Sequence, residues 1–154
     1  MRLCSEIISA LSGKTVATAE SCTGGMIGAA LTAISGSSKV YKGGVISYTN
    51  EIKHNVLGVP LSLLDTCGAV SAEVAEAMAL GVRKLLDTDY AVSVTGLAGP
   101  GGDEYGNPVG TVFIGYADEN CCVSEHYVFK GDRESVRNQA AENALALLLS
   151  KIKE

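Results

Sequence analysis

Long apolar runs, clusters of basic side chains and metal-ligand motifs are all missing from this sequence of 154 residues. No apolar run reaches the roughly 18 residues that a membrane-spanning helix needs. The N-terminal residues also lack the apolar core of a signal peptide. We therefore expect a cytoplasmic protein that does not contact a membrane.

Basic side chains are too few for a broad nucleic-acid surface. Lys and Arg number 12 against 17 Asp and Glu, which gives a net charge of −5. Binding to a phosphate backbone needs clustered Lys and Arg, and no basic stretch interleaved with aromatic residues occurs. We expect no nucleic-acid partner, whereas a small anionic ligand needs only a few local cations.

Metal ligands are also scarce. The two histidines, His54 and His126, are far apart in sequence, and the five cysteines form no C-x-x-C pair. A zinc site needs a tighter cluster of ligands, so we expect no metal. An odd number of cysteines in a chain without a secretion signal is typical of reduced thiols.

What is present indicates one globular α/β domain over residues 1–154. The hydrophobic fraction is 47% and the charged fraction 19%, which is usual for a chain that buries a core. Hydrophobic periodicity predicts helices at 2–12, 26–33, 51–57, 72–86 and 133–152, and strands at 15–19, 45–48, 90–94, 109–117 and 122–129. This order predicts a mixed, mostly parallel sheet with helices on both faces.

The strongest chemical feature is Ser21, in the segment E-S-C-T-G-G between a predicted strand and a predicted helix. Backbone N–H groups at a helix start are unpaired and face outward, so they can bind a phosphate or stabilise an oxyanion. Ser21 is therefore a candidate nucleophile, although Ser21 and Thr23 could equally be ordinary helix caps. Cys22 is a rival nucleophile, because the pKa of a thiol at a helix start can be lowered.

A candidate base follows the second predicted strand. With Asn50 as the N-cap, Lys53 falls in the first turn of a helix, where the helix dipole disfavours its charged form. Partial burial would lower the pKa of Lys53 further, and a lysine that loses its proton can serve as the base for a serine. Tyr48 could orient the pair or relay a proton. An ordinary solvated Lys53 and a core Tyr48 remain the alternative.

Two further segments favour ligand binding. The glycine-rich stretch 95–102 follows a buried strand, which is where open α/β sheets bind ligands, although it matches no Walker or Rossmann pattern and could be a flexible connection. Arg133 and Arg137 share a face near the start of the last helix, which is the unfavourable end for cations. They indicate an anionic ligand, or else a solvated face paired with Asp132 or Glu134.

Together, these segments resemble the CinA C-terminal domain family, whose members are also called PncC or nicotinamide-nucleotide amidohydrolase. The resemblance covers about residues 5–150. Its motifs, in chain order, are A-E-S-C-T-G-G at 19–25, G-V-I-S-Y-T-N-E-I-K at 44–53, G-A-V-S at 68–71, G-L-A-G-P at 96–100 and G-D-R at 131–133.

The resemblance implies a three-layer α/β/α sandwich and the deamidation of nicotinamide mononucleotide to nicotinate mononucleotide and ammonia by a Ser/Lys mechanism. It implies no cofactor, and a small pyridine nucleotide as the partner; whether the chain forms a homo-oligomer stays open. The implied catalytic residues are Ser21, Tyr48 and Lys53. The implied substrate-binding residues are Thr23, Gly24, Gly25, Gly96, Gly99, Arg133 and Arg137, with Arg137 ahead of Arg133 at the substrate phosphate.

One position departs from the family pattern. Relatives often carry Lys where this chain has Asn107, which could weaken phosphate binding or change the substrate. Longer relatives have an N-terminal domain linked to pyrophosphatase activity, which we do not assign to this chain. The rival function is a non-catalytic nucleotide-binding or interaction domain related to competence and DNA-damage proteins. The complete set of Ser21, Tyr48 and Lys53 favours an enzyme.

Overall fold

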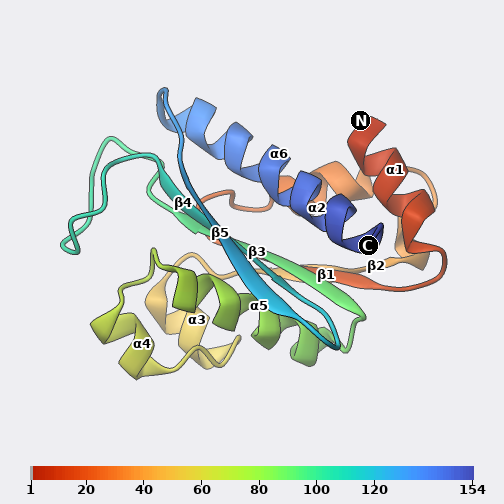
Figure 1. The fold of residues 1–154 in the computed structure, drawn as a ribbon, viewed down its shortest axis with the longest axis horizontal. Helices are drawn as coiled ribbons and strands as arrows, with labels where there is room; N and C mark the ends of the chain where they lie inside the picture. The colour runs from red at the N-terminus through yellow and green to blue at the C-terminus, as the bar shows by residue number, and fades with distance from the viewer. Residues whose placement is uncertain (1) are drawn as a thin grey trace.

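A five-stranded sheet with helices on both faces forms the centre of the computed structural model, which describes residues 2–154 (Figure 1). The strands are β1 (Val16–Glu20), β2 (Tyr41–Ile46), β3 (Tyr90–Gly96), β4 (Thr111–Ala117) and β5 (Cys122–Val128). The helices are α1 (Arg2–Leu11), α2 (Met26–Thr32), α3 (Asn50–Asn55), α4 (Leu61–Thr66), α5 (Ala72–Leu86) and α6 (Arg133–Ile152), with a 3-10 helix η1 (Ser37–Lys39).

The sheet is mixed, with strand order β2-β1-β3-β4-β5. β1 pairs in parallel with β2 and β3, whereas β4 pairs antiparallel with β3 and β5. Four strands therefore share one direction and β4 alone runs against them, which confirms the predicted mixed, mostly parallel sheet. The carboxyl ends of β1, β2, β3 and β5 consequently meet at one edge, where α/β sheets commonly bind ligands.

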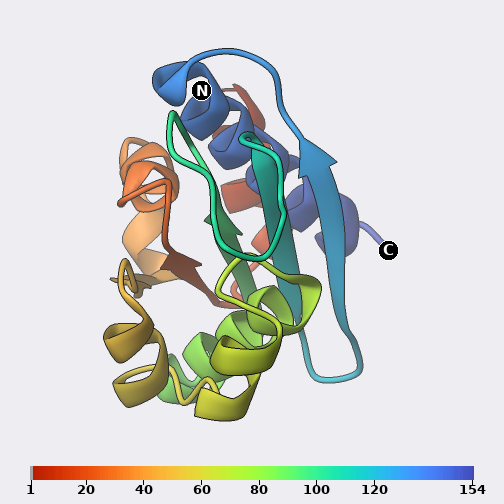
Figure 2. The ribbon, with the colours of Figure 1, turned by 90° about the vertical axis from the view of Figure 1, so that its left-hand side faces the viewer.

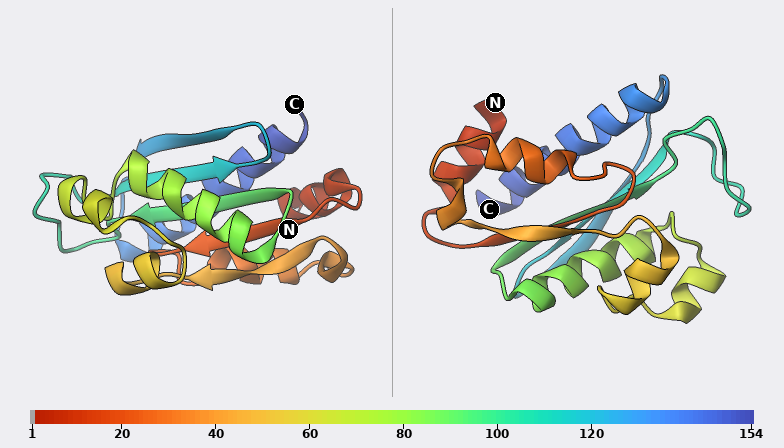
Figure 3. Two further views of the ribbon diagram at one scale, coloured as in Figure 1. Left: turned by 90° about the horizontal axis from the view of Figure 1, so that it is seen from below. Right: turned by 180° about the vertical axis from the view of Figure 1, so that it is seen from behind.

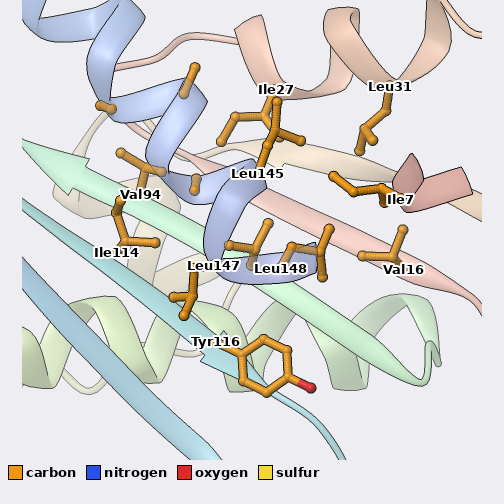
Figure 4. Packing of buried hydrophobic residues seen from close by; sticks show 14 of the residues in the cluster. Ile7, Val16, Ile27, Leu31, Val94, Ile114, Tyr116, Leu145, Leu147 and Leu148 are labelled. Atoms are coloured by element: carbon orange, nitrogen blue, oxygen red, sulfur yellow. The ribbon is translucent and has the colours of Figure 1, made fainter. Parts of the chain in front are cut away.

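Each face of the sheet has its own hydrophobic core. Helices α1, α2 and α6 cover one face and α3, α4 and α5 the other, so the predicted three-layer sandwich is confirmed (Figures 2 and 3). On the first face, Ile27 and Leu31 of α2 pack with Leu145 and Leu148 of α6 (Figure 4). All five residues of β1 are buried, because this central strand is covered on both faces.

One predicted strand differs from the structure, and two short helical segments were not predicted. The second strand lies at 41–46 instead of 45–48, because backbone pairing with β1 holds Gly43 and Gly44 in the sheet despite their low strand propensity. The short helix α4 was not predicted, since its six residues leave no clear periodicity. The 3-10 helix η1 was not predicted either. No helix within residues 2–154 is long and apolar enough to cross a membrane.

Candidate active site

Ser21 lies immediately after β1, between the ends of the two neighbouring strands. Its N–H donates to the carbonyl of Val94 in β3 at 3.0 Å, and the N–H of Ser47, just after β2, donates to the carbonyl of Glu20 at 2.8 Å. Three parallel strands thus end at the same level, and their connecting segments gather around one serine. The strand-to-helix position predicted for Ser21 is the one that it occupies.

The Lys53 side chain reaches Ser21 from α3, the helix that follows β2. Thr49 caps α3 by accepting the N–H of Ile52 at 3.3 Å, and this places Lys53 on the buried face of the helix, only 2% exposed. Its Nζ lies 3.0 Å from Ser21 Oγ and donates to the Ser47 carbonyl at 2.8 Å. A buried amine in contact with a buried hydroxyl is the arrangement that a serine nucleophile and its base require.

The Lys53 amine has no carboxylate partner among residues 2–154. The ion pairs in that range join side chains near the two chain ends. Burial lowers the pKa of Lys53 from its ordinary value of 10.5 to about 8, because an ammonium ion loses its hydration in the interior. At about pH 7.5, roughly a quarter of the molecules then hold a neutral amine.

The cause of this lowered pKa differs from the one predicted. Asn50 is the first residue of α3 and Thr49 is the cap, so Lys53 falls in the last turn of this short helix. The dipole there favours a cation, and burial is the dominant cause that lowers the pKa. The alternative of a solvated Lys53 is wrong, since the side chain is almost fully buried.

Cys22, the rival nucleophile, lies next to Ser21 and is also buried. Burial raises the pKa of the Cys22 thiol to about 11, so almost none of it is thiolate at neutral pH. Because the thiolate is the nucleophilic form, Cys22 is less suited to attack than Ser21 with its lysine.

Ser21 and Lys53 open into a cavity of about 450 Å³, a size usual for small-molecule sites. One wall is the glycine-rich segment 95–102. Gly96 has to be glycine there, because a Cβ would lie 2.7 Å from Val112 Cγ2 and 2.9 Å from the Thr111 carbonyl. Of the predicted site residues, the cavity lining contains Ser21, Tyr48, Lys53, Gly96, Gly99 and Arg133.

Arg133 and Tyr48 lie together at the exposed rim of this cavity. Arg133 donates to the Gly99 carbonyl at 2.8 Å and to the Tyr48 hydroxyl at 3.2 Å. Tyr48 is 59% exposed, so it is no core tyrosine, and the bond to Arg133 is the one its hydroxyl makes among residues 2–154. Tyr48 is therefore placed to contact a ligand, with no hydrogen bond to Ser21 or Lys53.

The other predicted binding residues do not line the cavity. Arg137 donates from Nε to the Cys22 carbonyl at 2.8 Å and from Nη2 to the Thr23 carbonyl at 3.4 Å, and it does not line the cavity. Thr23, Gly24 and Gly25 are likewise absent from the lining. The structure therefore separates Arg133 from Arg137, although the two share a helix face.

Glu20 is the site residue that the sequence did not reveal. Its carboxylate, 2% exposed, accepts the Thr23 hydroxyl at 2.7 Å and the N–H groups of Gly25, Ile27 and Gly28 at 3.0–3.2 Å. The expectation that these N–H groups face outward is thus wrong, because Glu20 occupies the start of α2. An acidic residue just before a helix start was the available signal.

Asn107, the departure from the family pattern, stays outside the cavity lining. Its side-chain amide donates to the Asp103 carboxylate at 2.8 Å and to the Val70 carbonyl at 3.2 Å. Asn107 therefore fastens the loop that follows the glycine-rich wall. Within residues 2–154, no cluster of three or more His, Cys, Asp and Glu side chains has the arrangement of a metal site.

Known proteins are similar to this chain in both sequence and fold. The sequence model of the CinA C-terminal domain matches residues 2–152. A CinA-like protein from Geobacter metallireducens is 49% identical over 140 residues, 91% of this chain and 34% of the relative. One from Synechocystis is 49% identical over 136 residues, 86% of this chain and 33% of the relative. The chain thus spans about a third of the length of these curated relatives.

Solved structures match over almost the whole chain. The competence damage-inducible protein A from Klebsiella pneumoniae has a TM-score of 0.96 at 37% identity, covering 99% of this chain and 96% of that one. A competence/damage-inducible protein from Agrobacterium tumefaciens has a TM-score of 0.94 at 38% identity, covering 99% and 94%. With the family's motifs and its fold both present, this chain belongs to the CinA C-terminal domain family.

Proposed function

We propose that this protein is a Ser/Lys amidohydrolase that deamidates nicotinamide mononucleotide to nicotinate mononucleotide and ammonia without a metal or cofactor. The observation that carries the proposal is the buried Lys53 Nζ, 3.0 Å from Ser21 Oγ, with its pKa lowered to about 8. A binding domain would gain nothing from burying an unpaired amine, which costs stability. The choice of substrate comes from the family resemblance.

The first step is the attack of Ser21 on the carboxamide carbon. Neutral Lys53 Nζ accepts the proton of the Ser21 hydroxyl while Oγ forms the new bond to carbon. The Ser47 carbonyl accepts one N–H of the amine at 2.8 Å, which leaves the nitrogen lone pair free to face Ser21. Lys53 is therefore oriented by the backbone as well as activated by burial.

The developing oxyanion needs a donor beside Ser21, and we assign the N–H of Cys22 to this role. Cys22 lines the cavity, and among residues 2–154 its N–H donates to no other residue. The N–H of the residue after a nucleophilic serine serves in the same way in other hydrolases. Such a fixed donor stabilises the charge that appears as the tetrahedral intermediate forms.

Collapse of the intermediate releases ammonia. Protonated Lys53 gives its proton to the amide nitrogen, the C–N bond breaks, and an ester of Ser21 remains. Water then loses a proton to Lys53 and attacks the ester, and Lys53 returns a proton to Ser21 Oγ as the acid leaves. One lysine thus moves every proton, which requires its pKa to lie near the working pH.

For the substrate phosphate, the geometry favours Arg133. Arg133 lines the cavity beside Tyr48, whereas Nε and Nη2 of Arg137 donate to the Cys22 and Thr23 carbonyls and Arg137 does not line the cavity. The guanidinium of Arg133 has no carboxylate partner among residues 2–154, and arginine is well suited to phosphate oxygens. We therefore reverse the order of the two arginines that the resemblance implied.

The test is ammonia release from nicotinamide mononucleotide by the purified protein and by Ser21→Ala. We expect turnover by the wild type and loss of at least about 10³-fold in Ser21→Ala, with unchanged far-ultraviolet circular dichroism. Tight binding without turnover at high protein concentration would instead favour the non-catalytic nucleotide-binding domain. Turnover retained in Ser21→Ala would move the nucleophile elsewhere.

A further inference from the structure

The turn that carries Ser21 is held on one side by an arginine from a distant part of the chain. Arg137, in the second turn of α6, donates to the carbonyls of Cys22 and Thr23. The guanidinium also packs against the turn, since a Cβ on Gly24 would lie 3.3 Å from Arg137 Nη2. A cation thus bonds the carbonyl side of this turn.

A buried anion holds the opposite side of the same turn. The Glu20 carboxylate accepts the Thr23 hydroxyl and three backbone N–H groups at 2.7–3.2 Å. Charge-assisted hydrogen bonds of this kind are about twice as strong as neutral ones. Residues 21–25 therefore lie between two charged groups: Glu20 accepts the Thr23 hydroxyl and the Gly25 N–H, and Arg137 donates to the Cys22 and Thr23 carbonyls.

Two hydrogen bonds, one within the turn and one to Arg137, fix the direction of the peptide groups on either side of Cys22. In a planar trans peptide the carbonyl and the N–H point in opposite directions. The Ser21 carbonyl accepts the Gly24 N–H at 3.1 Å, so the Cys22 N–H points the other way. The Cys22 carbonyl faces Arg137, so the Thr23 N–H points away from Arg137.

We propose that Arg137 and Glu20 are positioning residues that clamp residues 21–25, and that this clamp holds Ser21 Oγ and the Cys22 N–H in the geometry needed for attack. This proposal rests on the proposed function, in which Ser21 is the nucleophile. It can be tested without the nucleotide, because it predicts the reactivity of Ser21 toward any acyl- or sulfonyl-type electrophile. Arg137 then acts on the bond-forming step and not on the phosphate of the substrate.

Two arginines on one helix allow a matched comparison. Arg137→Met removes the clamp, Arg133→Met removes the rim cation, and Arg83→Met, at the far end of α5, is a control outside the site. We expect Arg137→Met to lower kcat by the same factor for nicotinamide mononucleotide and nicotinamide riboside, with KM little changed. Arg133→Met should instead raise KM for the phosphorylated substrate and reduce the preference for it.

The closing experiment measures the labelling of Ser21 by phenylmethylsulfonyl fluoride, followed by mass spectrometry, so that it needs no nucleotide substrate. We expect Arg137→Met to react at least about tenfold more slowly than wild type, with partial recovery in added guanidinium ion at non-denaturing concentration. Arg83→Met, outside the site, should react within about twofold of wild type. Glu20→Gln should also react slowly, because its NH₂ group would face the donors of the turn.

The outcomes separate the clamp from the proposed activity. Wild-type labelling without ammonia release would refute the deamidase function while leaving the clamp testable by Arg137→Met. Labelling of Arg137→Met at the wild-type rate, or no labelling of Ser21 in the wild type, would overturn the clamp. If Arg137→Met does not fold, Arg137→Lys gives the answer, with an intermediate rate expected because one ammonium replaces a forked donor; a rate equal to wild type would again overturn it.

Discussion

Burying Lys53 should cost the folded protein stability at neutral pH, and the cost should disappear as the pH rises. The pKa of Lys53 is about 8 in the folded state against an ordinary value of 10.5. Between these two values the unfolded chain binds a proton that the folded chain does not, so the free energy of unfolding rises with pH. Below about pH 7 the amine is mostly protonated in both states, and the folded protein is then destabilised by the full cost of a buried ammonium.

The magnitude follows from the two pKa values. Each pH unit across the interval is worth about 1.4 kcal/mol for one proton. We therefore expect a gain in unfolding free energy of about 2 kcal/mol between about pH 7 and pH 9.5, and of about 3 kcal/mol once the pH exceeds 10.5. This is a large part of the usual stability of a domain, 5–15 kcal/mol as an order-of-magnitude range.

Lys53→Met isolates this contribution, because methionine fills a similar volume without a charge. The constant part of its effect includes the loss of a donor for the Ser47 carbonyl, which costs about 1–3 kcal/mol. The informative quantity is hence the difference between wild type and variant as a function of pH, in which the other titrating groups cancel. Between about pH 7 and pH 9.5, the unfolding free energy of the wild type should rise by about 2 kcal/mol more than that of Lys53→Met.

Urea unfolding followed by far-ultraviolet circular dichroism measures this difference, since the chain has no tryptophan to report by fluorescence. Equal denaturant slopes in the two proteins are needed for the comparison. Lys39→Met is the control. Lys39 is exposed, so its replacement should leave the pH dependence of the unfolding free energy unchanged. A wild type and a Lys53→Met variant whose stabilities change in parallel with pH would refute the assignment of a desolvated amine.

The remaining predictions concern the chemistry. kcat/KM should rise with pH and level off above about 8, as Lys53 loses its proton; a flat profile from about pH 6 to 9 contradicts a lysine base. Lys53→Arg should lose activity as fully as Lys53→Ala, because a guanidinium keeps its proton, and a near-normal rate would exclude the base role. Cys22→Ala should keep kcat within about threefold, since its thiol stays protonated; a loss above about 100-fold would return the thiol to the reaction. Activity should be unchanged by EDTA, and loss that one divalent ion restores would contradict this.

Local patterns in the sequence were sufficient to predict most of the fold. The periodicity of α5 and its cap Ser71 are local properties, and the structure shows Ser71 accepting the Val74 N–H. The position of Ser21 could also be predicted from neighbouring residues, because a strand, a glycine pair and a helix follow one another in that part of the sequence. The second strand was predicted at 45–48 instead of 41–46. Pairing with β1 stabilises β2, and residue propensities do not include such pairing.

The environment of the site residues could not be predicted, because it depends on contacts between distant segments. Nothing near Lys53 in sequence indicates that it is buried against Ser21, 32 residues away. Arg133 and Arg137 are equivalent by helical spacing, yet one reaches the Gly99 carbonyl at the cavity rim and the other the Cys22 carbonyl. Only the packing of α6 on the strand ends separates their roles.

Glu20 and Lys53 are two nearly fully buried ionisable side chains next to Ser21. They differ in how many hydrogen bonds they form. Glu20 accepts four hydrogen bonds, so its charge is compensated by fixed dipoles and its oxygens are occupied. Lys53 contacts one hydroxyl and one carbonyl and has no opposing charge among residues 2–154. A buried carboxylate whose oxygens are all hydrogen-bonded stabilises a conformation, whereas a buried ammonium without an opposing charge loses its proton more easily. In the proposed function, Glu20 supports the turn that carries Ser21, and Lys53 reaches Ser21 from α3 to accept its proton.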